Sequence, residues 1–98
     1  MRKRGKTDAN QTEIVQALRQ TGGCEVLSLA ALGAGAPDLL IWRRGTLRFY
    51  LCEIKDGSKP ASRRKLTLDQ INFHRLWPVH VVTSIDEALA VVGVKRRK

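Results

Sequence analysis

The sequence predicts an α/β fold in which a central mixed sheet is flanked by helices. Three apolar segments of strand length follow an amphipathic helical segment, and a fourth strand-like segment lies between two further helical segments. Strands joined by short turns pair antiparallel, whereas a strand reached through a helix can pair in parallel, so one sheet should contain both kinds of pairing. The expected order is α-β-β-β-α-β-α in a single domain, because 98 residues suffice for one small core.

The first helix is expected over residues 8–21. Ile14, Val15 and Leu18 form an apolar stripe at helical spacing, and Gly22-Gly23 end it, since glycine is common at helix C-termini. The strands that follow are rich in apolar, aromatic and β-branched residues and are bounded by glycine, proline and a short turn. They are predicted over residues 24–29, 38–42 and 47–55.

The second half of the chain carries two predicted helices on either side of one strand. The first of these begins at Thr67, where Thr67 and Gln70 form a T-x-x-Q capping box, and it ends before Pro78. The remaining elements are a strand over residues 79–83 and a helix through about residue 92, which Ser84 and Glu87 open as another capping box.

The charge balance is strongly positive and indicates a polyanionic partner. Eighteen Lys and Arg against nine Asp and Glu give a net charge of +9 and a pI near 10.4. Nucleic acid is the expected partner of so basic a small domain. A basic arm over residues 1–7, predicted to be disordered, and a basic tail over residues 93–98 enclose the domain over residues 8–92. The alternative for both ends is a solvated tail without a partner.

Several functional classes are disfavoured by composition. The sequence has no apolar run of membrane-spanning length and no secretory signal pattern, so no membrane association is expected. Cys24 and Cys52 are isolated, which predicts reduced core cysteines and a cytoplasmic location. His74 and His80 lack a zinc-ligand spacing and are expected to be structural or incidental. No nucleotide-binding glycine motif or catalytic triad pattern is present, so no organic cofactor is expected.

Asp38, Glu53 and Lys55 form the most informative pattern in the chain. Asp38 follows Pro37 at the start of one predicted strand, and Glu53 and Lys55 lie on the same face at the end of the next. Charged groups at the end of an apolar strand face are costly unless something compensates them. If the two strands pair as a hairpin, the two carboxylates converge, with the lysine beside them. Such oxygen ligands suit Mg²⁺, and the lysine suits charge growing on a phosphate.

This pattern resembles the PD-(D/E)xK nuclease signature, and the longer string resembles the VRR-NUC branch of that superfamily. The resemblance covers residues 33–92 and implies a restriction-endonuclease-like α-β-β-β-α-β core with a Mg²⁺ or Mn²⁺ site. It also implies that the backbone carbonyl of Ile54 is a metal ligand. The matching residues are Gly35-Ala36-Pro37-Asp38-Leu39, Glu53-Ile54-Lys55, Ser62-Arg63 and Leu66-Thr67-Leu68-Asp69-Gln70.

Two further residues are candidates with equally good structural alternatives. Glu13 lies on the first helix, and related nucleases often bring a helix glutamate to the metal, but a solvated glutamate is also favoured in a first helical turn. Gln70 matches a glutamine that in the family supports the lysine or a water on the metal, but its capping-box role accounts for it too.

The expected function is therefore metal-dependent, structure-selective cleavage of DNA phosphodiester bonds. Stand-alone, often phage-encoded members of the family act as Holliday junction resolvases, so the resemblance implies branched DNA as substrate, a bacterial or phage setting and a homodimer. The alternatives are a flap or single-strand nuclease, and a non-catalytic basic DNA-binding protein on the same fold. The catalytic candidates are Asp38, Glu53, Lys55 and Gln70; the expected backbone-phosphate contacts are Arg43, Arg44, Lys59, Arg63, Arg64 and Lys65.

Overall fold

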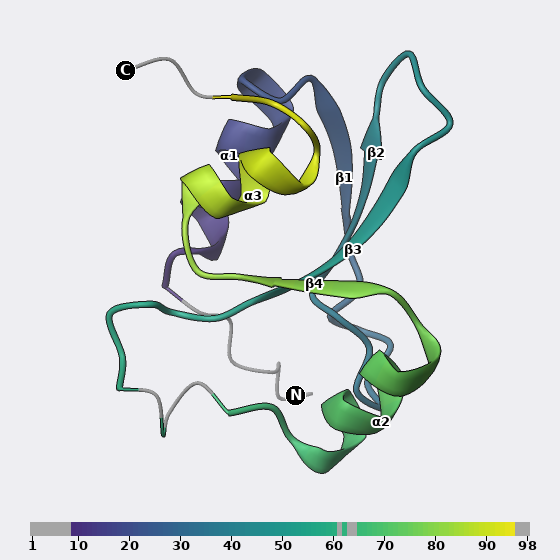
Figure 1. Cartoon of the computed structure of the whole chain (residues 1–98), viewed down its shortest axis with the longest axis vertical. Helices are drawn as coiled ribbons and strands as arrows, with labels where there is room; N and C mark the ends of the chain where they lie inside the picture. Colours follow the sequence, from purple (N-terminus) through teal and green to yellow (C-terminus); the bar gives the residue numbers. More distant parts are fainter. Residues whose placement is uncertain (1–8, 61, 63–64, 96–98) are drawn as a thin grey trace.

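A four-stranded mixed sheet runs through the middle of the protein, and three helices lie around it in the computed structural model, which describes residues 9–60, 62 and 65–95. The order of elements in this part of the chain is the predicted one (Figure 1). The elements are α1 (Gln11–Gln20), β1 (Cys24–Ser28), β2 (Leu39–Arg43), β3 (Phe49–Ile54), α2 (Leu68–Leu76), β4 (Val79–Val82) and α3 (Ile85–Val91). The predicted arm over residues 1–7 and the end of the predicted tail, residues 96–98, lie outside the described residues.

The strands occur in the sheet in sequence order, β1-β2-β3-β4. The first three form an antiparallel meander, and α2 carries the chain back so that β4 pairs with β3 in parallel. The predicted mixed sheet is therefore confirmed. Leu39 pairs with Cys52 and Trp42 with Phe49, which fixes the register of the β2–β3 hairpin.

One face of the sheet is covered by α1 and α3, which lie side by side (Figure 1). The apolar stripe predicted for α1 supplies Ile14 and Leu18, both fully buried. Ala88 and Leu89 of α3 belong to the same buried core, together with the strand residues that point to this face of the sheet. The buried core consists of Ile14, Leu18, Cys24, Val26, Leu39, Ile41, Cys52, Ile54, Val82, Ala88, Leu89 and Val92. Both cysteines are free thiols, as predicted, and burial raises the pKa of Cys52 to about 12.

The opposite face of the sheet is apolar but largely open. Leu27, Phe49 and Val81 expose 62%, 61% and 45% of their surface, and Phe49 stacks on Trp42 with ring centroids 6.4 Å apart. Because side chains alternate along a strand, Glu53 belongs to this face as well. Glu53 is nevertheless buried, which sets it apart from its neighbours on the same face.

α1 begins at Gln11, three residues later than predicted, because Asn10 makes other contacts. Its side chain forms no helix cap. Instead, Asn10 Nδ2 donates to the carbonyl oxygens of Lys55, at 3.2 Å, and Thr83, at 3.0 Å. The start of α1 is therefore joined to the ends of the parallel strands β3 and β4.

α2 lies at the other end of the sheet from α1 and α3 (Figure 1), and its N-terminus has the predicted capping box. The Thr67 hydroxyl accepts from Gln70 N at 3.2 Å, and Gln70 Oε1 accepts from Thr67 N at 2.9 Å. The bend before β2 contacts the first turn of α2 through Gly35, which has a φ of +81°. A Cβ at Gly35 would meet the backbone carbonyl of Asp69 and would lie 2.8 Å from Gln70 N, so only glycine fits there.

The capping box predicted for α3 is half correct. The Ser84 hydroxyl accepts from Glu87 N, as expected. The Glu87 carboxylate, however, accepts from the backbone N–H and hydroxyl of Thr83 rather than from Ser84 N, because Thr83 offers it two donors. After α3, Val94 packs against the core, two residues beyond the predicted end of the domain. Within the described residues, no helix has the length and apolar character needed to cross a membrane.

Candidate functional site

Asp38 and Glu53 meet at the end of the β2–β3 hairpin. Continuing the pairing of Leu39 with Cys52 by one residue places Asp38 directly opposite Glu53. Directly opposite residues of an antiparallel pair point to the same face, with Cβ atoms about 4.5–5.5 Å apart. The predicted convergence of the two carboxylates is therefore present in the structure.

The carboxylate of Asp38 is held against the backbone of β3. Its Oδ2 accepts a hydrogen bond from Ile54 N at 2.7 Å, a short distance typical of a charged acceptor. This bond fixes Asp38 beside Glu53 and beside the residue whose carbonyl is the third expected metal ligand. Pro37, which is buried, opens the strand and sets the direction in which Asp38 leaves the preceding bend.

Glu53 is a buried carboxylate that is only partly satisfied. Its Oε2 accepts from Gln70 Nε2 at 2.9 Å, whereas its Oε1 is buried and has no hydrogen-bond partner among the described residues. The pKa of Glu53 is raised to about 7: burial is the largest cause, the nearby Asp38 carboxylate acts in the same direction, and Lys55 opposes both effects. Two carboxylates held together in this way repel each other, and a bound cation would relieve that repulsion.

Lys55 completes the group from the same face of β3. Its Nζ lies 3.7 Å from Glu53 Oε2, and only 15% of its side chain is exposed. Its backbone is fixed on both sides: Lys55 N donates to Val82 O at 3.0 Å, and Lys55 O accepts from Asn10. The ammonium is therefore held beside the carboxylates instead of extending into solvent.

Gln70 makes the predicted capping box, and it also contacts the candidate site through Glu53, which is neither the lysine nor a water on a metal. Its side-chain oxygen closes the capping box of α2, and its side-chain nitrogen donates to Glu53. One amide therefore ties the N-terminus of α2 to the candidate site. The close approach of Gly35 to the backbone of Asp69 and Gln70 fixes the helix in the position that this contact requires.

The donor set suits a hard divalent cation with few protein ligands. Asp38 and Glu53 offer carboxylate oxygens, and the buried, unpaired Oε1 of Glu53 is an acceptor without a donor. Among the described residues, no three His, Cys, Asp or Glu side chains converge. Glu13 therefore does not complete a three-carboxylate group with Asp38 and Glu53; it is exposed in the first turn of α1.

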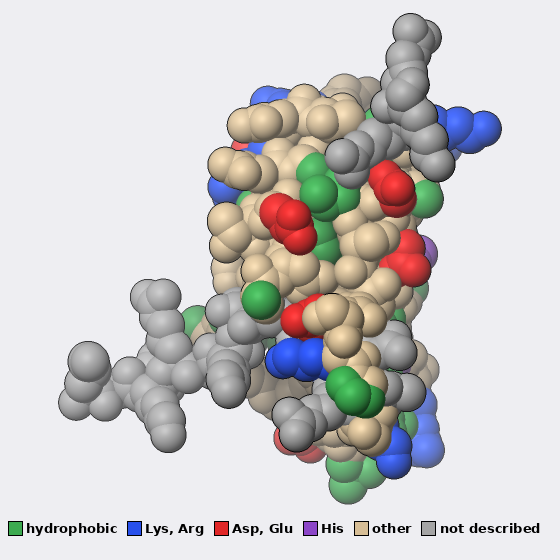
Figure 2. Space-filling view, turned by 90° about the vertical axis from the view of Figure 1, so that its left-hand side faces the viewer, with side chains coloured by type: hydrophobic (Ala, Val, Ile, Leu, Met, Phe, Trp, Pro, Cys, Tyr) green, Lys and Arg blue, Asp and Glu red, His purple; other side chains and the backbone are tan. Residues whose placement is uncertain are grey.

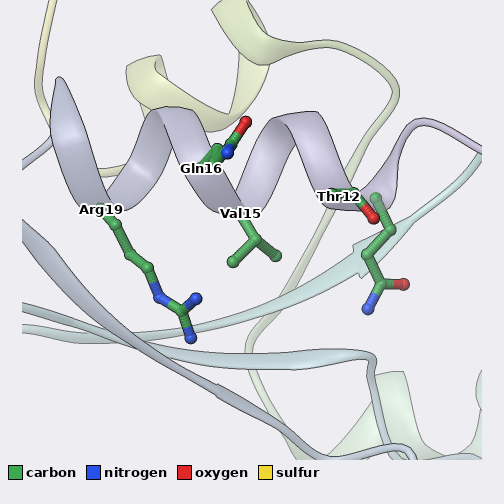
Figure 3. A pocket seen from close by; sticks show the side chains of 5 residues that line it. Thr12, Val15, Gln16 and Arg19 are labelled. Carbon is green, nitrogen blue, oxygen red and sulfur yellow. The ribbon is translucent and has the colours of Figure 1, made fainter.

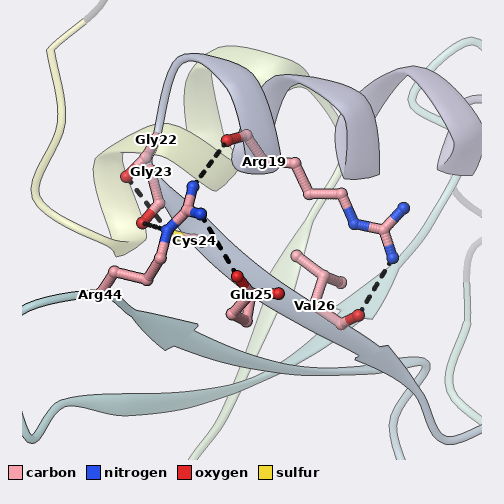
Figure 4. Close-up of polar contacts among 7 residues, drawn as sticks. All are labelled: Arg19, Gly22, Gly23, Cys24, Glu25, Val26 and Arg44. Atoms are coloured by element: carbon pink, nitrogen blue, oxygen red, sulfur yellow. Dashed lines mark hydrogen bonds and ion pairs between the residues drawn. The ribbon is translucent and has the colours of Figure 1, made fainter.

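Arg43 and Arg44 lie at the opposite end of the sheet from this site, because Arg43 ends β2 and Arg44 follows it, whereas Asp38 precedes the strand. Arg43 donates to Val92 O at 2.8 Å, after the end of α3. Arg44 donates to the carbonyl oxygens of Arg19 and Gly23 and pairs with Glu25 at 3.3 Å (Figure 4). Both guanidinium groups thus bind the protein itself, away from Asp38 and Glu53, and their expected contact with backbone phosphates stays a prediction.

The other expected phosphate contacts belong to the segment between β3 and α2. Lys59 and Lys65 are exposed there, and Arg63 and Arg64 lie outside the described residues. The described residues contain nine Lys and Arg and eight Asp and Glu, so half of the basic side chains belong to the rest of the chain. Figure 2 shows acidic side chains spread over the face that carries α1 and α3, with basic side chains mainly toward its edges.

Sequence reasoning missed two residues near the site, Asn10 and His74. Asn10 binds the Lys55 backbone from 45 residues away, a contact that no local pattern reveals. His74 is half-buried, and within the described part of the chain its buried Nε2 has no hydrogen-bond partner. The sequence could have indicated His74 through its position four residues after Gln70, because this spacing places both residues on one face of α2. His80, by contrast, is exposed beside Tyr50, with ring centroids 6.1 Å apart, as an incidental histidine would be.

A separate hollow lies along α1, away from the carboxylates. All the residues that line it belong to this helix (Figure 3), and one of them, Arg19, donates to Val26 O at 3.1 Å (Figure 4). None of them is a residue of the candidate site. The lining residues are Gln11, Thr12, Val15, Gln16 and Arg19.

Comparisons with models of known protein families, with curated proteins and with solved structures found no match. The candidate site is therefore defined by its geometry alone.

Proposed function

We propose that the protein is a metal-dependent, structure-selective DNA endonuclease of the VRR-NUC type, built on a restriction-endonuclease-like core. The observation that carries this proposal is the pairing of Asp38 with Glu53 at a hairpin end, with Lys55 on the same face. A protein that needed only a stable sheet would gain nothing from a buried, half-satisfied carboxylate facing a second one. A phosphodiesterase would use the same arrangement.

The two carboxylates and the carbonyl of Ile54 would hold Mg²⁺ or Mn²⁺. When bound, the ion would supply Lewis-acid chemistry to a phosphodiester and to the attacking water. Asp38 is pre-positioned for this role by its bond to Ile54 N, and Glu53 by its bond to Gln70. The pKa of Glu53 is raised first by burial and then by the charge of Asp38, and a bound cation would oppose both effects.

Lys55 would stabilise negative charge on the phosphate or orient the attacking water. Its side chain is nearly buried, so its charge acts at a lower effective dielectric constant than a surface lysine. Gln70 would support this arrangement indirectly, because it keeps Glu53 in place while it anchors α2.

DNA recognition would depend on backbone phosphates and on the shape of the DNA. Lys59, Lys65 and the basic residues of the two termini would contact phosphates, which carry no sequence information. We propose four-way junctions as the substrate and a C₂ homodimer as the working form, since two matched nicks need two sites. The open apolar face with Leu27 and Phe49 is one surface that a second copy would cover. Light scattering should then give about twice the 11.0 kDa chain mass.

The decisive experiment incubates a fluorescent four-way junction with the protein, with and without Mg²⁺. Asp38→Asn, Glu53→Gln and Lys55→Met should each remove cleavage while leaving junction binding within a few-fold. Glu25→Gln is the matched control, because it makes the same chemical change in an exposed carboxylate next to Arg44. Glu13→Gln tests the remaining candidate ligand in the same assay.

Each alternative function gives a different result in this assay. A flap or single-strand nuclease would cut branched or unpaired DNA only outside the junction centre and would not produce symmetric nicks. A non-catalytic binder would retain the junction equally well with and without Mg²⁺ and would leave it intact. Normal cleavage by the Glu53→Gln protein would show that the proposed site is wrong.

A further inference from the structure

α2 is the least embedded element of the fold. It has no buried residue, and among the helices and strands of the described residues it alone lacks an extensive contact with another of them. Figure 1 shows it apart from α1 and α3; it touches the rest of the chain at Gly35 and, through Gln70, at Glu53. A helix of nine residues is too short to be stable in water by itself, so further contacts must hold it.

The two faces of α2 have different surroundings. Gln70, Phe73 and His74 are half-buried on the face that contacts Glu53. The opposite face is exposed and follows the spacing i, i+3, i+4, i+7 and i+8, which is typical of a helix stripe that packs against a partner. Its three apolar side chains expose 72%, 40% and 82% of their surface. In order along the helix, this stripe consists of Leu68, Ile71, Asn72, Arg75 and Leu76, of which the apolar members are Leu68, Ile71 and Leu76.

The side chains of α2 are arranged symmetrically about Asn72, the middle one of its nine residues. Leu68 lies four positions before Asn72, and Leu76 lies four positions after it. Asp69 lies three positions before Asn72, and Arg75 three positions after it; both are exposed. Two such helices that are antiparallel about a two-fold axis at Asn72 bring leucine level with leucine and aspartate level with arginine. A parallel pair would instead bring like charges level with each other.

Asn72 suits a position on the two-fold axis. Its amide carries both donors and an acceptor, so two copies can hydrogen-bond to each other there. A single asparagine within an apolar contact between helices also fixes their register. The uncovered stripe and its complementary charges therefore point to a second copy of this chain as its occupant.

We propose that the exposed stripe of α2 is the two-fold contact of a homodimer, with the two helices antiparallel and Asn72 on the axis. Each α2 then has its own candidate site on one side and the second copy on the other, so the two sites lie on opposite sides of the helix pair. Because Gln70 holds Glu53 from the same helix, a contact that fixes α2 also fixes this carboxylate. As part of a junction-cleaving enzyme the dimer rests on the proposed function, but the contact itself needs neither metal nor DNA.

The first test is disulfide formation in metal-free, DNA-free protein. Asn72→Cys should give a covalent dimer under mild oxidation, because residues that face each other on a two-fold axis come within the range of a disulfide. Gln16→Cys is the matched control, since it makes the same change at an exposed position of α1, and it should stay largely monomeric. Both native thiols are buried and should not react. Equal cross-linking of the two variants, or none in Asn72→Cys, would overturn the inference.

The second test compares dimer dissociation constants by sedimentation over a series of concentrations. Leu76→Asp should weaken the dimer by about tenfold or more, because an apolar side chain leaves the contact. Since Leu76 is exposed within one chain, urea unfolding of this variant should show that the fold is retained. Asp69→Arg and Arg75→Asp should each weaken the dimer several-fold, and the double variant should recover most of the loss, as antiparallel pairing requires.

Two results of this test would refute the inference. The first is a wild type that stays monomeric at submillimolar concentration. The second is a dimer that Phe49→Asp dissociates and the α2 variants do not, because the second copy would then cover the open face of the sheet.

Cleavage of a four-way junction separates this inference from the nuclease proposal. Leu76→Asp should convert the paired, symmetric nicks into single nicks at a concentration where the wild type is a dimer. Paired nicks made by this variant as a monomer would refute the role of the contact in cleavage. If the wild type cross-links through Asn72→Cys but does not cleave, the proposed function fails and the contact stands.

Discussion

The buried carboxylate of Glu53 predicts a pH dependence of stability that is opposite to that of most acidic residues. The pKa of Glu53 is raised from 4.5 to about 7, so the folded state holds a proton that the unfolded state has already lost at intermediate pH. The contribution of Glu53 to the free energy of unfolding is therefore greatest below about pH 4.5. It falls as the pH rises from there to about 7. At 1.36 kcal/mol per pKa unit, the difference between a pKa of 4.5 and one of about 7 corresponds to about 3 kcal/mol in the free energy of unfolding.

The assay is urea unfolding of the metal-free protein at a series of pH values, repeated for Glu53→Gln. The difference between the two proteins isolates Glu53 from other titrating groups, including His74. Relative to Glu53→Gln, the wild type should lose about 3 kcal/mol between pH 4.5 and 7.5, and Asp38→Asn should reduce this loss, because the Asp38 charge contributes to the raised pKa. Parallel pH profiles for wild type and Glu53→Gln would refute the reasoning.

Three further predictions concern the metal, the bend before β2 and the start of α1. Mg²⁺ at a hundred times its dissociation constant should stabilise the protein by about 2.7 kcal/mol at pH 8, and Asp38→Ala should show little of this shift in a thermal melt. Gly35→Ala should lower the melting temperature far more than Gly33→Ala, because both glycines have positive φ but only a Cβ at Gly35 meets the backbone of α2. An equal loss in both alanine variants would mean that α2 does not depend on this contact. Asn10→Ala should cost about 2 kcal/mol in urea unfolding, because two carbonyl oxygens lose their donor; a cost near zero would show that water replaces the side chain.

The fold could be predicted from the sequence because its signals are local. Apolar, β-branched runs bounded by glycine and proline marked the strands, and T-x-x-Q marked the start of α2. The convergence of Asp38 and Glu53 could be predicted as well, since it needs only hairpin pairing and the two-residue alternation of strand faces.

The surroundings of the site could not be predicted, because their contacts join residues far apart in the chain. Asn10 reaches Thr83 across 73 positions, and Arg43 reaches Val92 across 49. A basic residue in a turn looks the same in sequence whether it contacts a phosphate or a helix C-terminus. Arg43 and Arg44 were expected at a DNA-binding surface, and the carbonyl groups that engage them became visible only in three dimensions.

The hairpin register makes the spacing between the two strands part of the site. The turn between β2 and β3 lies at the far end of the hairpin from Asp38, where Trp42 Nε1 donates to Thr46 O at 2.7 Å. If the pairing slipped by one residue, Asp38 would face Cys52 or Ile54, and the two carboxylates would no longer share a face. Loss of a single residue from this remote turn would therefore dismantle the site while leaving every one of its side chains in the sequence.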